Sequence, residues 1–140
     1  MDRNQDTMMQ LALKYNLPFT SITVAYQGIT TDIPHVLIDT GSGRTILAAD
    51  IVACLGIVPS EKDMPYAVRG VGGTEIVFAR RVDYVKIGEY CLSDFEIEIG
   101  GMDYGFEING IIGTDFLINS GAIINLRESY IEFENYGDAT

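Results

Sequence analysis

The sequence has no tryptophan, one histidine and two cysteines among its 140 residues. A nucleophilic enzyme with a histidine base would have to use His35, which lies in a predicted strand directly after a proline. We expect His35 to be structural or to face solvent. Cys54 and Cys91 lack the paired spacing of zinc or redox motifs, and a disulfide scaffold would carry more cysteines. We expect both to be reduced residues of the core.

The sequence has no apolar run long enough to cross a bilayer. Its longest apolar runs, residues 51–59 and 116–126, are short and are broken by polar residues or glycine. The polar residues 1–6 are not followed by the apolar stretch of a signal peptide. These features predict a soluble, cytoplasmic protein with no membrane partner.

Positive charge is scarce. Nine Lys and Arg residues face 20 Asp and Glu residues, which gives a formal net charge of −11. The basic residues are scattered, and only Arg80 and Arg81 are adjacent. Because phosphate backbones and anionic lipids are bound by clustered positive charge, we expect no nucleic-acid partner.

No residue pattern indicates a metal or a cofactor. Asp103, Glu107 and Asp115 fall on different predicted elements without calcium-binding spacing, and Asp115 is expected to cap a short helix or to face solvent. Residues 70–73 are glycine-rich, but they lack the lysine and hydroxyl residue of a phosphate-binding loop. The sequence therefore predicts no metal and no cofactor.

Short segments typical of strands make up most of the chain. Residues 22–26 alternate, Gln27-Gly28 reads as a tight turn, and a second strand begins at Ile29. Val36-Leu37-Ile38 is short and apolar, as expected of a strand buried on both faces. Further strands are predicted over residues 64–68, 75–86, 92–99, 111–112, 122–126 and 130–133.

Two short helices complete the predicted plan. Residues 48–55 have helical spacing and end at Gly56, which suits a left-handed cap, and a second helix follows Gly113. With 47% hydrophobic residues, one core fits this length. We predict a single domain over residues 1–140, all-β with two short helices, and flexible ends at residues 1–12 and 135–140.

The segment Asp39-Thr40-Gly41-Ser42 places a carboxylate directly after a buried strand. Such a group is unfavourable unless it is hydrogen-bonded. Gly41 lets backbone amides approach the carboxylate, and the hydroxyls of Thr40 and Ser42 can fix its orientation. The same four residues also fit an aspartate that only accepts hydrogen bonds from its own turn. Taken alone, the segment leaves both interpretations open.

The order of motifs resembles the retropepsin-like, or retroviral-type, aspartic proteases over residues 18–133. An apolar triplet precedes Asp-Thr-Gly-Ser, and a short helix, a glycine-tipped hairpin and an Ile-Ile-Gly segment before a second helix follow. The resemblance implies an acid-protease barrel that carries one half of the active site per chain. It also implies that residues 122–126 and 130–133 form a C-terminal hairpin.

The resemblance assigns expected roles to individual residues. Asp39 takes the place of the catalytic aspartate, and Thr40, Gly41 and Ser42 take the places that support the catalytic loop. The tip of a flap that closes over substrate falls on Gly70, Val71, Gly72 and Gly73. The apolar pair and glycine that pack beneath the catalytic loop fall on Ile111, Ile112 and Gly113.

One position departs from the family pattern. Retroviral members usually carry an acidic residue two places after the catalytic glycine, where it holds the substrate backbone, and this chain has Gly43 there, followed by Arg44. Arg44 could replace that anchor, could select acidic substrates, or could be solvated.

Hydrolysis of a peptide bond by carboxylates needs two of them, and the sequence contains one Asp-Thr-Gly-Ser segment. The resemblance therefore implies a homodimer in which two Asp39 carboxyls meet on a two-fold axis and hydrolyse a peptide or protein substrate. The alternative is a catalytically silent dimeric β-barrel that binds peptides or acts as an interaction module. A structural subunit with an acidic surface is a third, weaker possibility.

Overall fold

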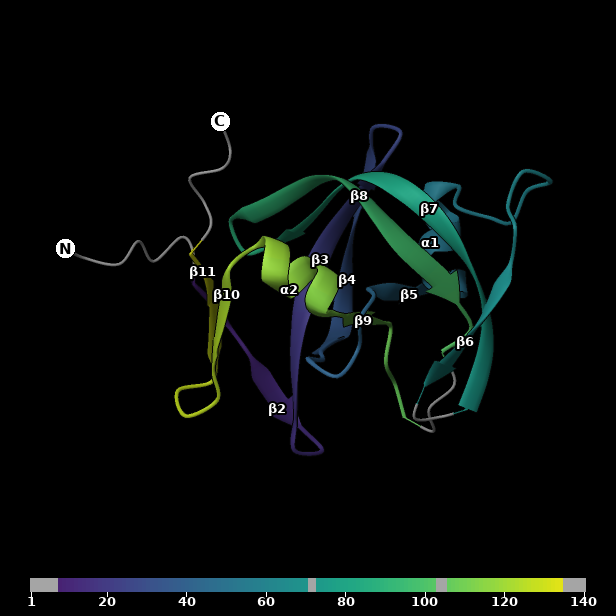
Figure 1. Cartoon of the computed structure of the whole chain (residues 1–140). Helices are drawn as coiled ribbons and strands as arrows, with labels where there is room; N and C mark the ends of the chain where they lie inside the picture. The colour runs from purple at the N-terminus through teal and green to yellow at the C-terminus, as the bar shows by residue number, and fades with distance from the viewer. Residues whose placement is uncertain (1–7, 71–72, 103–105, 135–140) are drawn as a thin grey trace.

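The computed structural model describes residues 8–70, 73–102 and 106–134 (Figure 1). The strands are β1 (Met8–Gln10), β2 (Ala12–Lys14), β3 (Leu17–Tyr26), β4 (Ile29–Ile38), β5 (Ile46–Ala48), β6 (Tyr66–Gly70), β7 (Gly73–Ile87), β8 (Tyr90–Gly100), β9 (Gly110–Ile112), β10 (Ala122–Asn125) and β11 (Tyr130–Phe133). The helices are α1 (Ala49–Val52), the 3₁₀ helix η2 (Ala53–Leu55) and α2 (Thr114–Asn119). The predicted all-β class with two short helices is confirmed. Among the described residues, no helix is long and apolar enough to cross a membrane.

The larger of the two sheets closes on itself. Its eight strands follow the order β2-β3-β4-β9-β5-β8-β7-β6, and β3 also pairs with β7. This extra pairing closes the strands from β3 to β7 into a barrel. Strands β1, β11 and β10 form a separate three-stranded sheet, and β10 and β11 lie beside α2 (Figure 1).

Turn and cap residues account for the main local predictions. Gln27 and Gly28 join β3 to β4 with φ angles of 50° and 84°. Two successive residues with positive φ are typical of a type I′ turn, whose twist matches that of the strands it joins. Gly56 ends η2 in the left-handed conformation, with a φ of 83°. Both predicted boundaries are confirmed.

Strand β4 carries the chain toward the Asp39 segment through the middle of the sheet. It lies between β3 and β9, and its last three residues are buried, as predicted. Val36 and Ile38 pack into the larger core cluster, whereas Leu37 packs into a second cluster on the other face. Strands β4 and β9 are parallel, and Ile38 is paired with Ile112. The residues that follow the two strands therefore leave the sheet side by side, at the same end of the strands.

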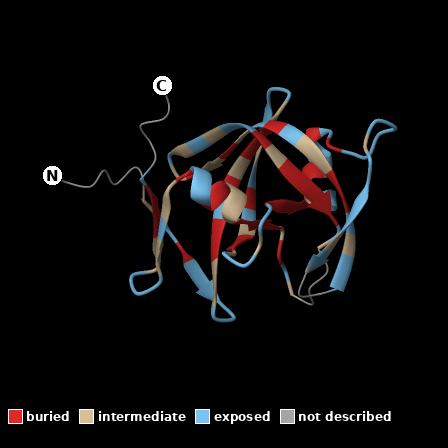
Figure 2. Ribbon diagram, viewed as in Figure 1, coloured by how far each residue is buried: buried red, intermediate tan, exposed pale blue. Residues whose placement is uncertain are grey.

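The larger core cluster fills the barrel between the sheet and the helices, where Figure 2 shows the buried residues together. Phe116 of α2 is fully buried within it. Its ring lies edge-on to the rings of Tyr90, Phe95 and Phe133, at centroid distances of 6.0, 5.8 and 6.2 Å. This packing fixes α2 against the barrel.

The second cluster lies on the opposite face of the β4–β9–β5 region. Its buried members are Phe19, Leu37, Ile46, Val77, Ile108 and Ile111. Partly buried residues that pack against it include Val68 of β6 and Met102. We refer to these residues as the second apolar cluster.

Part of the N-terminal segment, residues 8–14, forms two short strands. Strand β1 pairs with β11 and strand β2 pairs with β3. Leu11 between them is 3% exposed, and its amide donates to the carbonyl of Ser129 at 2.8 Å. Burial of Leu11 fastens this segment to the core. Residues 1–7 and 135–140 lie outside the described residues.

The predicted burial of the cysteines is wrong. Cys54 and Cys91 are free thiols, as expected, but both are exposed. Cys91 is opposite Lys86 in the β7–β8 ladder, and Cys54 lies in the short η2 turn with its thiol directed to the carbonyl of Ile51 at 3.2 Å. Apolar neighbours in the sequence did not reveal which face of each element these residues occupy.

Replacing Phe116 by alanine should lower the free energy of unfolding by about 3–5 kcal/mol, because it opens a cavity among three aromatic rings. Urea unfolding followed by circular dichroism measures this loss. Ile118→Ala, in the same helix, is the matched control because Ile118 is 78% exposed, and it should change stability by less than about 0.5 kcal/mol. Equal losses for the two variants would contradict the packing described for α2.

Candidate active site

The Asp39 side chain is held by the turn that follows β4. The Asp39 amide donates to the carbonyl of Ile112 at 3.0 Å, which ties the start of the turn to β9. The Gly41 amide donates to Asp39 Oδ1 at 2.8 Å, and the Ser42 amide donates to the Asp39 carbonyl at 3.2 Å. A Cβ at position 41 would lie 3.1 Å from Oδ1. Glycine therefore suits the close approach of amide and carboxylate that the sequence predicts.

The two hydroxyl residues of the loop, Thr40 and Ser42, have different surroundings. Ser42 Oγ donates to the carbonyl of Arg44 at 2.8 Å, so in a single chain it stabilises the loop instead of orienting Asp39. The Ser42 carbonyl accepts from the amide of Thr114 at 2.7 Å and from its Oγ1 at 3.2 Å. Thr40 is exposed at the surface of the loop. Asp39 as a whole residue is half-buried.

The segment Ile111-Ile112-Gly113 lies directly against the Asp39 loop. The two isoleucines belong to β9, which pairs with the end of β4. Gly113 has no room for a side chain, because a Cβ there would lie 2.6 Å from the carbonyl oxygen of Arg44 and 2.8 Å from that of Ser42. The close contact of loop and segment thus requires glycine at position 113.

Sequence reasoning missed a buried polar contact between the loop and helix α2. Thr45 is fully buried, and its amide and Oγ1 donate to Oδ2 and Oδ1 of Asp115 at 3.0 and 2.8 Å. Thr45 Oγ1 also accepts from the amide of Gly113 at 3.1 Å. Asp115 accepts from the amide of Phe116 at 2.7 Å in the first turn of α2. Asp115 therefore joins the loop to the helix, beyond the capping or solvent-facing role that was predicted.

Arg44 is paired within the chain, which corrects the interpretation of a solvated cation. Its Nη2 lies 3.0 Å from Glu96 Oε1, and its Nε lies 3.6 Å from Asp115 Oδ2. Partial burial alone would lower the pKa of Arg44, but the hydrogen bond to Glu96 and the nearby charge of Glu98 raise it above its usual value. In a single chain the guanidinium is thus engaged by carboxylates, and it is not a free anchor for substrate.

The glycine-rich hairpin is formed by β6 and β7. Their pairing runs from Tyr66 opposite Val77 to Gly70 opposite Gly73. Gly73 has a φ of 112°, a conformation that favours glycine. The predicted tip residues Val71 and Gly72 lie outside the described residues. Val68 and Val77 of the hairpin contribute to the second apolar cluster, which also contains Ile111 of β9.

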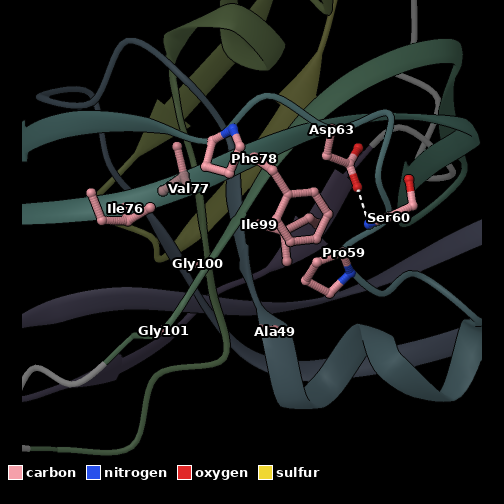
Figure 3. Close-up of a pocket in the computed structure, with 11 residues that line it drawn as sticks. Ala49, Pro59, Ser60, Asp63, Ile76, Val77, Phe78, Ile99, Gly100 and Gly101 are labelled. Atoms are coloured by element: carbon pink, nitrogen blue, oxygen red, sulfur yellow. Dashed lines mark hydrogen bonds between the residues drawn. The ribbon is translucent and has the colours of Figure 1, made fainter.

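A pocket of about 270 Å³ lies between the segment before β6, strand β7 and the end of β8 (Figure 3). Its lining is mostly apolar and includes Pro59, Val77, Phe78 and Ile99. Asp39 is not among the lining residues.

The segment beside this pocket is held by Asp63. Asp63 Oδ2 accepts from the Ser60 amide at 2.7 Å, the bond drawn in Figure 3, and from Arg80 Nη2 at 2.8 Å. The hydrogen bond from the Ser60 backbone and the charge of Arg80 lower the pKa of Asp63, although partial burial acts in the opposite direction.

The other candidate groups do not form a site. His35 Nε2 lies 3.7 Å from Glu107 Oε1, and both side chains are partly exposed. Asp103 lies outside the described residues, and Asp115 is engaged with Thr45. In the described ranges, no three His, Cys, Asp or Glu residues are grouped so that they could hold a metal ion.

A comparison with known protein families matches the part of the chain that contains the Asp39 loop. A family model described as aspartyl protease matches residues 22–116, more than half of the chain. The matched region begins in β3, includes the Asp39 loop and the β6–β7 hairpin, and ends in α2. No curated protein matches the chain significantly.

Replacing Thr45 by valine should lower the free energy of unfolding by about 1–3 kcal/mol, because the buried Gly113 amide and Asp115 carboxylate each lose a partner. Thr23→Val is the matched control. It also removes a threonine hydroxyl that donates to a carboxylate, Asp32 Oδ1 at 2.7 Å, but this bond is exposed. Urea unfolding of both variants measures the difference. A Thr45→Val variant as stable as the control would contradict the role of this contact.

Asp63→Asn should destabilise the protein at neutral pH, and this loss of stability should become smaller as the pH falls into the acid range. The pKa of Asp63 is lowered in the folded state from its ordinary value of 3.8, so the ionised carboxylate adds stability above that value. This contribution is lost as the pH falls through the folded-state pKa, where the wild-type carboxyl becomes neutral like the amide. Thermal unfolding of both proteins at about pH 7 and pH 3 measures the change. A difference in Tm between wild type and variant that is larger at about pH 3 than at about pH 7 would contradict a lowered pKa of Asp63 in the folded state.

Proposed function

The chain belongs to the aspartyl protease family, and we propose that it is an endopeptidase whose active site forms between two copies of the chain, with their Asp39 carboxyls on a two-fold axis. The observation that carries the proposal is the hydrogen bond from the Gly41 amide to Asp39 Oδ1, in a loop anchored to β9 and α2. A fixed carboxylate on a half-buried residue at the end of a strand suits acid–base catalysis.

A second chain is needed because the sequence contains one Asp-Thr-Gly-Ser segment. A symmetric dimer places the same residue of each copy on the axis, so one gene product supplies both carboxyls. Thr40 is exposed next to Asp39. Its position supports a contact between the two loops across the axis.

The proposed reaction uses one ionised and one protonated carboxyl, since two like charges so close together do not both ionise readily. The ionised Asp39 takes a proton from water as the water oxygen attacks the scissile carbonyl carbon, and the other Asp39 gives its proton to the carbonyl oxygen. The tetrahedral intermediate then breaks its C–N bond. One carboxyl protonates the departing nitrogen while the other takes back a hydroxyl proton, so the pair again holds one proton.

The substrate is an extended peptide that lies between the two Asp39 residues and the β6–β7 hairpin. β6 is the last strand of its sheet, so a peptide can pair with exposed backbone groups nearby. Val68 of the hairpin, Ile108 and, on β9, Ile111 belong to the second apolar cluster. Their side chains support subsites that take apolar residues of the substrate.

Asp39→Asn should reduce peptide cleavage by about 10³-fold or more while Tm changes little, because the amide keeps the size of the carboxyl but cannot exchange protons. Cleavage of a fluorogenic peptide library measures activity. Asp32→Asn is the matched control, since Asp32 is an exposed, hydrogen-bonded aspartate on β4, the strand that precedes the Asp39 loop.

Mixing wild type with excess Asp39→Asn chains should also suppress activity, because mixed dimers contain a single Asp39 carboxyl. Cleavage that survives in the Asp39→Asn protein would rule out this mechanism. Subunit exchange without loss of rate would rule out the shared site. Peptide binding without any cleavage by the wild type would favour the silent peptide-binding module.

A further inference from the structure

Glu98 is a buried carboxylate that the proposed reaction does not use. It is 5% exposed and lies on β8, on the face opposite that of Ile97 and Ile99. Its Oε2 accepts a hydrogen bond from Tyr66 Oη at 2.7 Å. A carboxylate removed from water depends strongly on its hydrogen-bond partners. The contact with Tyr66 is therefore important for both groups.

This contact lies at the base of the β6–β7 hairpin. Tyr66 is the first residue of β6 and is opposite Val77 of β7. Strand β7 begins to pair with β8 one residue later, where Phe78 is opposite Ile99. The part of the hairpin beyond this point pairs only between β6 and β7 and extends past the main sheet. Contacts at the base of the hairpin therefore set the direction in which its outer part extends.

Glu98 also faces the segment that follows Asp39. It is paired in register with Ile46 of β5, two residues after Arg44. Arg44 binds Glu96, which lies on the same face of β8 as Glu98, and the charge of Glu98 contributes to the raised pKa of Arg44. The hairpin and the catalytic loop therefore both interact with this side of β8.

We propose that Tyr66 is a positioning residue for substrate binding, and that its hydrogen bond to Glu98 fixes the angle at which the β6–β7 hairpin lies over the catalytic loop. This inference rests on the proposed function, because it assigns the hairpin to the cover of the peptide cleft. A fixed hairpin loses less conformational freedom when substrate binds. Removal of the hydroxyl should therefore act on substrate affinity and leave the chemical step at Asp39 nearly unchanged.

The test is Tyr66→Phe, which keeps the ring and removes the hydroxyl. KM for a cleaved peptide should rise about five- to tenfold while kcat stays within about twofold, the signature of weakened binding. Hydrogen exchange of the amides of residues 66–70 and 73–77 should become faster in the same variant. This second measurement does not depend on catalysis.

Two further variants separate positioning from general stability. Glu98→Leu should reproduce the rise in KM, and Glu98→Gln should recover much of the loss because its amide oxygen still accepts from Tyr66. Thr23→Val removes another hydroxyl–carboxylate bond of 2.7 Å, on the β3–β4 hairpin, and should leave KM unchanged. If Thr23→Val raises KM as much as Tyr66→Phe, the effect is one of stability and the inference fails.

The outcomes distinguish this inference from the proposed function. If the wild type cleaves peptides through Asp39 but Tyr66→Phe leaves KM or the exchange of the hairpin amides unchanged, the positioning role is wrong and the protease function stands. If Tyr66→Phe lowers kcat in the same proportion as kcat/KM, Tyr66 acts on the chemical step and the positioning role is also wrong. If the wild type shows no cleavage that depends on Asp39, the proposed function fails, and the role of Tyr66 in substrate binding fails with it.

Discussion

The contact of Thr45 with Asp115 joins two segments that are 70 residues apart in the sequence. This contact attaches helix α2 to the Asp39 loop. The Thr114 amide, which donates to the Ser42 carbonyl, is a second attachment. The helix is in turn fixed by Phe116, whose burial fastens it to the barrel. The orientation of one loop carboxylate therefore depends on a chain of contacts that ends in the main core. A loop alone would not be rigid enough for this purpose.

The barrel supplies the frame for both the loop and the hairpin. Because β3 pairs with β7 as well as with β4, the strands that carry the two functional segments belong to one closed sheet. The loop follows β4, and the hairpin extends from β7 beyond the pairing of Phe78 with Ile99. Val77 of the hairpin and Leu37 and Ile111 beside the loop belong to the second apolar cluster. In the proposed enzyme, substrate binding can then be adjusted at the base of the hairpin without changing the loop.

Local sequence signals predicted much of this fold. Gln27-Gly28 identified the β3–β4 turn, Gly56 identified the end of the first helix, and the apolar triplet before Asp39 identified a strand buried on both faces. These features are encoded by neighbouring residues, through positive φ or hydrophobic pattern. The close approach of Gly41 to the Asp39 carboxylate was predictable for the same reason.

The polar contacts around the site could not be predicted in this way. Arg44 is paired with Glu96 and Asp115 because β8 and α2 are brought beside the loop by the closed sheet, and no local pattern encodes that proximity. Alternation along a strand places Glu98 on the face of β8 opposite Ile97, but a strand pattern does not reveal that Tyr66 of the β6–β7 hairpin binds Glu98 on that face. Ordered pairing of β1 with β11 was missed for the same reason, since it joins opposite ends of the chain.

A site assembled from two identical halves requires that each half be well formed before the chains meet. Two carboxyls share a proton only when their oxygens come within hydrogen-bond range, and an error in one loop is repeated in the other by symmetry. Each chain also carries a formal charge of −11, so association into the proposed dimer must overcome repulsion between the copies. A loop that had to become ordered during association would add an entropic penalty to that repulsion. The buried contacts of Thr45, Gly113 and Asp115 reduce this penalty, because they fix the loop within the single chain.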